Sequence, residues 1–457
     1  MKKNRIFAGC LCLITALCLP ACSKEIPQEN PIIETQENNP ETEPAPEQEI
    51  NPEPGSDPAK EIFWLSDYDL NPLPGQQRDP ALAIFEDQYH GKITWLWCDP
   101  AKRTETLTTL IQGGDAVDMV SFQTEDFPSG IREDLFQPLD TYLDLTDPIW
   151  DGVRNPIENY AYNGAHYVIP YTMGHNLLLI YDRNVCTENS LADPYELYQS
   201  GEWTWDAFLD MMQEFTAGNS KRSGITGNVG RGILQSTGIQ IAGTAGQFGN
   251  HIEDPAIGNA ENLIQTIANA DLYDPAFYNS APENILFYAM EDWALDQSNA
   301  INPDADYMAV PFPKETGTES YYLTGNYESK LLVKNSTKGE AVAAYLYCER
   351  LAHTDPAYLE QIKEYSLTGQ TSAAGQVLSY RTEEQYNAIL DYQTNLECII
   401  DPAYGMGSEL YGDGEYTYET KGVMNRLEES ILKDGKSWEE ILADCNTSID
   451  DTLKNYK

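Results

Sequence analysis

Residues 61–122 alternate short apolar runs with amphipathic stretches, and this alternation restricts the fold more than any other feature of the chain. The apolar runs predict three buried strands, at residues 61–66, 92–98 and 118–122. The stretches between them predict two helices. Because a strand–helix–strand–helix–strand order requires right-handed crossovers, the strands should form a parallel sheet. We therefore expect an α/β fold.

Local signals set the bounds of the two helices. Asp79 is expected to cap the first helix, Pro80 to begin it and Gly91 to end it. Thr104 is expected to cap the second helix, and the glycine pair at 113–114 to stop it. Both helices are therefore predicted to lie between consecutive strands.

Polar and aromatic side chains follow the first and third predicted strands. Ligands of open α/β sheets bind beyond the carboxyl ends of the strands. The candidates there are Ser66, Asp67, Tyr68, Phe122, Glu125 and Asp126. Aromatic rings and carboxylates suit the CH faces and hydroxyl groups of a sugar. Within the second strand, Trp95 and Trp97 share one face, and we expect both to pack in the core.

Length and charge narrow the class of protein. A chain of 457 residues is too long for one ordinary core, so two or more lobes are expected. The formal net charge of −45 repels phosphate backbones, which argues against a nucleic-acid partner. The charge also suits an exposed, soluble surface, and selection for a cationic ligand is the alternative. With 29 tyrosines, 8 tryptophans and few cations, the composition favours a neutral polyol as ligand.

The N-terminus carries an export signal. Basic residues precede an apolar run at 6–20 that is too short to span a bilayer as a finished helix. Ala21-Cys22 then resembles a bacterial lipobox, which predicts a signal peptide at 1–21 and lipidation of Cys22. An ordinary cleaved signal peptide is the alternative. No other segment reaches the ~18 apolar residues that a membrane span needs.

Residues 22–59 are expected to form the lipidated cysteine and a disordered acidic tether, because they are rich in Glu and Pro and contain almost nothing apolar to bury. Five cysteines follow the tether, at positions 98, 186, 348, 398 and 445. Their odd number and wide spacing predict buried thiols with at most one or two disulfides.

Five further stretches, taken in order, resemble one family. They are residues 114–120 (GDAVDMV), 135–140 (LFQPLD), 167–182, 202–206 (EWTWD) and 310–351 with its Pro-Phe-Pro start and Gly325. They are similar to motifs of the extracellular solute-binding proteins of family 1, the maltose-binding-protein-like subunits of ABC importers. The resemblance covers roughly residues 60–457. Asn284–Trp293 departs from it, because the family's Gly-Lys-x-Ala-Met entry is missing there.

The resemblance implies a two-lobed, type II periplasmic-binding-protein-like fold. Each lobe would be a mostly parallel sheet flanked by helices, with hinge crossovers joining the two. Lobe I is expected to hold residues 60–170 and 309–370, and lobe II residues 171–308 and 371–457. A solute that touches both lobes would stabilise the closed state over the open one.

The resemblance also implies ligand contacts and partners. It places an aromatic ring and a carboxylate near Phe122 and Glu125, and a stacking tryptophan at Trp293. The remaining candidates are Tyr171, Met173, His175 and Asn326. The implied protein is a monomeric lipoprotein on the outer face of the cell membrane that passes a solute, a mono- or oligosaccharide, to the permease subunits of an importer.

Two other functions stay open. Acidic and aromatic residues also suit a surface glycoside hydrolase, and a lipoprotein can be an inert adhesin. The sequence contains no GxSxG or HExxH motif and no complete phosphate loop, so we predict no enzyme activity and no cofactor. Calcium candidates at 304–306 and 413–415 lack a full loop signature, so no metal is predicted.

Overall fold

The computed structural model describes residues 58–72, 78–244, 247–371, 376–407, 410–411 and 421–456. The predicted signal peptide, Cys22, nearly all of the tether and the calcium candidate at 413–415 lie outside these residues. The strands are β1 (Glu61–Ser66), β2 (Lys92–Trp97), β3 (Met119–Ser121), β4 (Ala161–Tyr162), β5 (Ala165–His166), β6 (Thr172–Asp182), β7 (Ser223–Gly227), β8 (Gly243–Thr244), β9 (Gln247–Phe248), β10 (Tyr273–Asp274), β11 (Ile285–Glu291), β12 (Tyr307–Val310), β13 (Tyr322–Glu328), β14 (Lys330–Leu332), β15 (Gln370–Thr371), β16 (Val377–Ser379) and β17 (Glu397–Ile399).

The α-helices alternate with these strands along most of the chain. They are α1 (Pro80–Tyr89), α2 (Arg103–Gly113), α3 (Ser129–Arg132), α4 (Arg154–Asn159), α5 (Arg183–Glu188), α6 (Pro194–Ser200), α7 (Trp205–Thr216), α8 (Val229–Gln235), α9 (Pro255–Asn269), α10 (Trp293–Ile301), α11 (Gly339–Ala352), α12 (Pro356–Thr368), α13 (Glu383–Asn395), α14 (Val423–Asp434) and α15 (Trp438–Leu453). Short 3-10 helices include η2 (Pro100–Lys102), η3 (Thr124–Asp126) and η5 (Pro402–Gly405).

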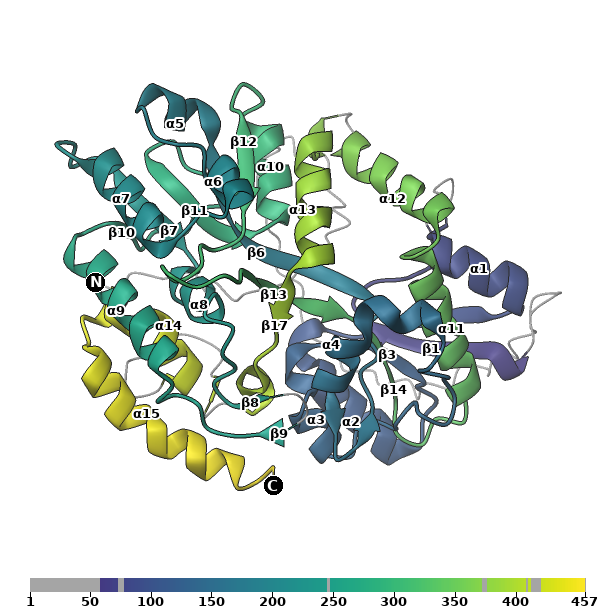
Figure 1. Cartoon of the computed structure of the whole chain (residues 1–457). Coiled ribbons are helices and arrows are strands. Elements are labelled where there is room, and N and C mark those ends of the chain that lie inside the picture. Colours follow the sequence, from purple (N-terminus) through teal and green to yellow (C-terminus); the bar gives the residue numbers. More distant parts are fainter. Residues whose placement is uncertain are drawn as a thin grey trace, which may run out of the picture. The chain divides into compact units, whose positions relative to one another are not determined.

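The smaller sheet has the strand order β14-β3-β1-β2. β1 is parallel to both β2 and β3, which confirms the parallel pairing predicted from the alternation, and β14 is antiparallel to β3. Helices α1 and α11 pack together on this sheet (Figure 1). Trp64, Phe85 and Tyr345 lie buried between sheet and helices, where they form the centre of one hydrophobic core.

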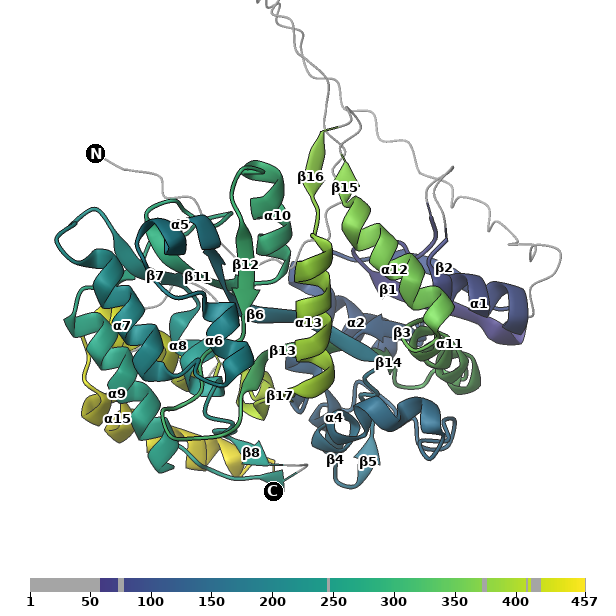
Figure 2. The ribbon, with the colours of Figure 1, turned by 45° about the horizontal axis from the view of Figure 1, so that its top comes forward.

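The larger sheet is mixed, with the order β10-β7-β11-β6-β13-β17, and β12 pairs with the far end of β6. β7, β10 and β11 are mutually parallel, whereas β6 is antiparallel to β11, β12 and β13. The long strand β6 leads from the helices beside the smaller sheet into the larger one (Figure 1). Helix α13 lies along β12 and β13 (Figure 2), where Tyr392 donates to the carbonyl of Ala309.

Sheet membership changes between β13 and β14, at Ser329. The boundary predicted at residue 309 falls within β12, where Ala309 pairs with Ile180 of β6 in the larger sheet. β13 also pairs with β6, so residues 307–328 belong to the larger sheet. The apolar runs of β12 and β14 look alike in sequence, and only their partners separate them.

Two local expectations are wrong. Helix α2 begins at Arg103 and has no side-chain cap, because the turn η2, which Asp99 caps, already leads the chain into the helix. Trp95 and Trp97 are 37% and 65% exposed rather than buried, because β2 is the edge strand of its sheet. The predicted N-cap at Asp79 is confirmed, and Ser437 and Glu440 form a capping box at the start of α15.

Gly91 also differs from its predicted role. The residue that ends α1 in the left-handed conformation is His90, with φ of 55°. A Cβ at Gly91 would lie 2.2 Å from the ring of Phe85, so this glycine is needed for the close approach of strand β2 to the helix. The five cysteines that follow the tether are all buried free thiols.

Candidate functional site

The carboxyl ends of β1 and β3 meet, as the topology predicted. The hydroxyls of Tyr68 and Ser121 are 3.0 Å apart, which joins the residues that follow β1 to the end of β3. Ser66 donates to the carboxylate of Asp67, and Asp67 is exposed. The Tyr68 ring packs edge-on against Trp64, with ring centres 5.7 Å apart. This edge of the smaller sheet therefore presents a half-buried tyrosine beside an exposed carboxylate.

Two segments that cross between the sheets run beside this edge. The hydroxyl of the buried Ser329 donates to the carbonyl of Ile169 at 2.9 Å and accepts from the Ile169 N–H at 3.1 Å. The N–H of Tyr171 donates to the carbonyl of Glu328. The N–H of Phe122 donates to the carbonyl of Ser329, which ties the end of β3 to the same crossing.

A lysine that sequence reasoning missed lies at the centre of this cluster. Lys330, at the start of β14, is 3% exposed and donates to the hydroxyl of Tyr171 at 2.9 Å. Its ammonium group lies 5.4 Å from the ring centre of Trp64 and 5.3 Å from that of Tyr171. A lysine that opens an otherwise apolar strand was the available signal, since buried lysines are rare unless paired.

Neighbouring acidic groups raise the pKa of Lys330. Burial alone would lower the pKa of Lys330, but Tyr68, Glu349 and Glu328 together raise it. Burial raises the pKa of Glu349 to about 7, although the charge of Lys330 opposes this rise. Burial likewise raises the pKa of Tyr171 well above its ordinary value. The crossing therefore contains a network of ionisable groups rather than an apolar seam.

A second charged cluster surrounds His175, in the middle of the crossing strand β6. Its Nδ1 lies 2.6 Å from the carboxylate of Asp292, which is only 6% exposed. Arg381 bridges Asp292 and Asp296. Burial alone would lower the pKa of His175, but the hydrogen bond and charge of Asp292 raise it to about 9. His175 is therefore a cation near neutral pH.

The other predicted contacts of the larger sheet lie near His175. Trp293 begins α10 and donates to the carboxylate of Glu291 at 2.9 Å. Asn326 is exposed on β13, and its amide oxygen would lie 2.3 Å from a Cβ at Gly174. Met173 accepts a hydrogen bond from Asn176 through its sulfur. Gly174 therefore lets the crossing strand pass directly against the side chains of β13.

Asp126 is buried and paired, whereas its neighbour Glu125 is exposed. Asp126 is 4% exposed, and Arg103 holds its carboxylate in a bidentate pair at 3.0 and 2.9 Å. The same carboxylate accepts from the N–H of Gln123. Glu125 is exposed on η3, beside this anchored turn. Phe122 packs edge-on against Tyr160. The buried pair thus positions the turn that carries Glu125.

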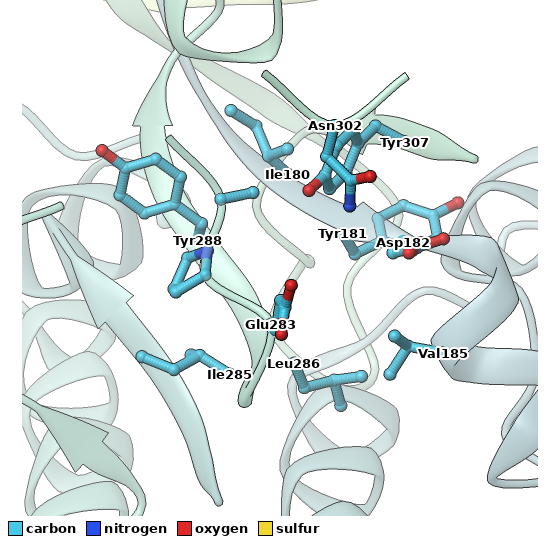
Figure 3. Close-up of a pocket in the computed structure, with 12 residues that line it drawn as sticks. Ile180, Tyr181, Asp182, Val185, Glu283, Ile285, Leu286, Tyr288, Asn302 and Tyr307 are labelled. Carbon is cyan, nitrogen blue, oxygen red and sulfur yellow. The ribbon is translucent and has the colours of Figure 1, made fainter. Parts of the chain in front are cut away.

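A small pocket among the described residues lies elsewhere (Figure 3). It measures about 70 Å³ and lies among β6, β11 and β12, where Tyr181, Glu283 and Asn302 are among its lining residues. None of the predicted site residues lines it. Drug-sized ligands occupy cavities of several hundred Å³, so this pocket is too small for a sugar.

The described residues contain neither a membrane-spanning helix nor a metal-binding group. No helix among them is long and apolar enough to cross a membrane. No group of three or more His, Cys, Asp or Glu side chains among them could hold a metal ion. In the calcium candidate at 304–306, the carbonyls of Asp304 and Asp306 accept from Asn184 and Arg183.

Two α/β sheets with shared crossing strands, and aromatic and charged residues gathered at the crossing, define a binding protein of the solute-binding class. The chain belongs to the bacterial extracellular solute-binding protein family, whose sequence profile matches residues 81–366, more than half of the chain. A comparison with curated proteins finds no match.

Solved structures show the same fold at low sequence identity. The cyclic α-maltosyl-1,6-maltose-binding protein of Arthrobacter globiformis is 13% identical, covers 86% of this chain and 99% of its own, and has a TM-score of 0.62. The galacto-N-biose-/lacto-N-biose I-binding protein of Bifidobacterium longum is 13% identical, covers 88% and 98%, and has a TM-score of 0.59.

A third solved structure bound a different kind of solute. UgpB of Mycobacterium tuberculosis, in complex with glycerophosphocholine, is 13% identical, covers 86% of this chain and 98% of its own, and has a TM-score of 0.55. These likenesses confirm the α/β, two-lobed fold predicted from the sequence.

Proposed function

We propose that this chain is a lipid-anchored binding subunit of an ABC importer that captures a sugar outside the cell. The observation that carries the proposal is membership of the extracellular solute-binding family. Several structural relatives are proteins whose names describe sugar binding or transport.

The predicted site residues support a polyhydroxylated ligand. Tyr68 and Trp293 are half-buried aromatic side chains, one beside each sheet. Asp67, Glu125 and Asn326 are exposed and can accept hydrogen bonds from hydroxyl groups. An aromatic ring that stacks on a sugar face, with polar groups at its edge, is the usual composition of such a site. We therefore propose these residues as ligand contacts.

Closure of the two halves about the crossing segments would let the permease distinguish the bound protein from the free one. Ser329 and Ile169 hold the two crossing segments together at one place, so the halves can rotate about a shared axis. A solute that contacts residues on both sides stabilises the closed arrangement by its extra contacts there. Permease subunits could then recognise the closed form whatever solute it holds.

A panel of mono- and oligosaccharides, followed by the melting temperature and tryptophan fluorescence of the protein from Ser56 to Lys457, tests the proposal. Saturation at about 100 times the Kd adds about 2.7 kcal/mol to the free energy of unfolding, so a true ligand raises the melting temperature clearly. We expect at least one sugar to do so. Small-angle scattering of the same mixtures should show compaction.

A pair of tyrosine variants tests whether Tyr68 contacts the sugar. Tyr68→Ala should weaken sugar binding, whereas Tyr365→Ala should not, because Tyr365 is 64% exposed on α12 and is not among the predicted ligand contacts. No response to any sugar would count against the proposal. Products released from a glycan panel by the pure protein would favour a hydrolase, and inertness in every assay would favour an adhesin.

The lipid anchor needs its own experiment, since Cys22 lies outside the described residues. We expect cells fed a labelled fatty acid to label the wild-type protein but not Cys22→Ala. Cys18→Ala, which changes a cysteine inside the apolar run, is the matched control and should stay labelled and membrane-bound. Equal labelling of Cys22→Ala and wild type would contradict the anchor.

A further inference from the structure

Helix α8 carries polar groups that the protein leaves unmatched. The Nε of Arg231 is buried and has no hydrogen-bond acceptor among the described residues. Within the same part of the chain, no carboxylate lies within salt-bridge distance of its guanidinium group. Other buried arginines are well matched: Arg103 and Arg381 each make bidentate pairs with aspartates. Arg231 is therefore an exception that needs a reason.

Gln235 repeats the pattern one helical turn further along. It is 4% exposed, and neither its amide nitrogen nor its amide oxygen has a hydrogen-bond partner in the described structure. Residues four apart lie on the same face of a helix, so Arg231 and Gln235 share one face of α8. Buried polar groups are paired in the great majority of cases. The unmatched Nε of Arg231 and the unmatched amide of Gln235, on one face of the helix, point to a missing partner.

Aromatic and acidic groups surround Arg231. Its guanidinium carbon lies 4.5 Å from the ring centre of Tyr404, on η5. The hydroxyl of Tyr404 donates to Glu428, and burial raises the pKa of Glu428 to about 7 although Arg231 opposes the rise. Burial alone would lower the pKa of Arg231, but Tyr404, Glu428 and, to a smaller extent, Glu291 at the carboxyl end of β11 raise it. Arg231 also acts electrostatically on Tyr160, which lies between α4 and β4.

This environment selects one kind of solute. The nearby acids offset the positive charge of Arg231, so an anionic ligand would meet opposing charges. Neighbouring hydroxyl groups of a sugar can accept from the planar guanidinium group and donate to carboxylates at once. The Gln235 amide offers both a donor and an acceptor. The aromatic rings nearby suit the CH faces of the same molecule.

We propose that Arg231 and Gln235 bind adjacent hydroxyl groups of a neutral sugar and thereby set the specificity of the site. This inference rests on the proposed function and deepens it, because it names the chemical feature that is recognised. Burying an unmatched polar group costs stability. If the protein retains them for binding, removing the Gln235 amide should weaken binding without lowering the stability of the unliganded protein.

The experiment compares Arg231→Met and Gln235→Met with wild type by calorimetric titration, using the sugar that shifts the melting temperature most. We expect each variant to bind at least ten-fold more weakly, which is about 1.4 kcal/mol. The unliganded melting temperature of Gln235→Met should stay equal or rise, because an unmatched polar group has been removed. A purely structural role for Gln235 would lower the unliganded melting temperature of Gln235→Met instead.

Arg222→Met is the matched control. Arg222 also stacks on an aromatic ring, 4.4 Å from the centre of Phe215, but its guanidinium donates to Asn189 and to a backbone carbonyl. This variant should lower the melting temperature and leave the sugar affinity within two-fold of wild type. Deoxy analogues give a second readout: removing the contacted hydroxyl should weaken binding to wild type but not to Arg231→Met.

The possible results distinguish a failure of this inference from a failure of the proposed function. If wild type binds a neutral sugar and both variants bind it equally well, the inference fails and the proposed function stands. If uronic acids bind wild type more tightly than the matching neutral sugars, the neutral specificity is wrong. If wild type binds no sugar at all, both the inference and the proposed function fail.

Discussion

Replacing Asp126 by Asn removes a buried negative charge while it keeps the shape of the side chain. The side chains of Arg103 and Asp126 are 6% and 5% exposed, and their two hydrogen bonds are 3.0 and 2.9 Å long. At an effective dielectric constant of about 20, charges ~3 Å apart attract by about 5 kcal/mol, which roughly offsets the cost of burying them. Removing one partner leaves the other charge uncompensated, and such changes cost about 3–5 kcal/mol.

We expect Asp126→Asn to lower the free energy of unfolding by that amount, measured by urea unfolding followed through tryptophan fluorescence. Asp151→Asn is the control, because Asp151 forms a comparable pair with Arg154 whose side chains are 67% and 40% exposed. Exposed pairs contribute less than about 1 kcal/mol. Replacing both members of the buried pair, as in Arg103→Met with Asp126→Leu, should cost less than Asp126→Asn alone, since no buried charge is stranded.

A loss of less than 1 kcal/mol for Asp126→Asn would refute this reasoning. If that variant kept its stability and lost sugar binding, Asp126 would be a ligand contact, as the sequence predicted, rather than the anchor of the turn at η3. If the double replacement cost as much as the single one, packing and hydrogen bonds, rather than charge, would account for the stability of this region.

Three further predictions concern single side chains. Because the pKa of His175 is raised from 6.5 to about 9, its contribution to stability is complete below about pH 6.5 and is lost as the pH rises through 9. The melting temperature of wild type should therefore fall more between pH 7 and about pH 10 than that of His175→Gln. Equal slopes for the two proteins would contradict the raised pKa of His175. Glu261 is fully buried with neither carboxylate oxygen bonded within the described residues, and burial raises its pKa well above 4.5, so its folded form holds a proton that the unfolded chain releases. Glu261→Leu should raise the free energy of unfolding by about 1–3 kcal/mol and make it less dependent on pH between pH 5 and about pH 8, whereas a less stable variant at both pH values would show an unseen partner. Trp97→Ala should change the free energy of unfolding by less than about 1 kcal/mol, because Trp97 is 65% exposed. Trp64 has no exposed surface, so Trp64→Ala should lower it by about 3–5 kcal/mol. Urea unfolding of both variants measures the difference.

Much of the smaller sheet followed from local pattern. The strands at 61–66 and 92–97, the cap at Asp79 and the parallel pairing all depend on short-range periodicity and on the rules of crossover connections. The same rules placed Tyr68 and Phe122 at neighbouring strand ends, where the structure finds them. Buried thiols were also predictable, because widely spaced cysteines in odd number do not form a scaffold.

Position within a sheet could not be read from the sequence. Trp95 and Trp97 have the alternation of a buried strand, but their exposure depends on β2 lying at the sheet edge. The sheet to which 307–328 belongs depends on pairing with β6, more than 120 residues earlier in the chain. Arg231 and Gln235 gave no local signal of their environment, and the lysine that opens the apolar strand β14 indicated burial but not its partners, because these partners come from distant segments.

The sequence by itself determined the α/β class, the order of elements and the family, since these follow from local periodicity and from motifs that each span a few residues. Only the tertiary structure decided which charges are paired and which polar groups are left unmatched. Hydrogen bonds and ion pairs form over a few ångströms between segments far apart in the chain, so the partners of Asp126, His175 and Arg231 exist only once the chain has folded.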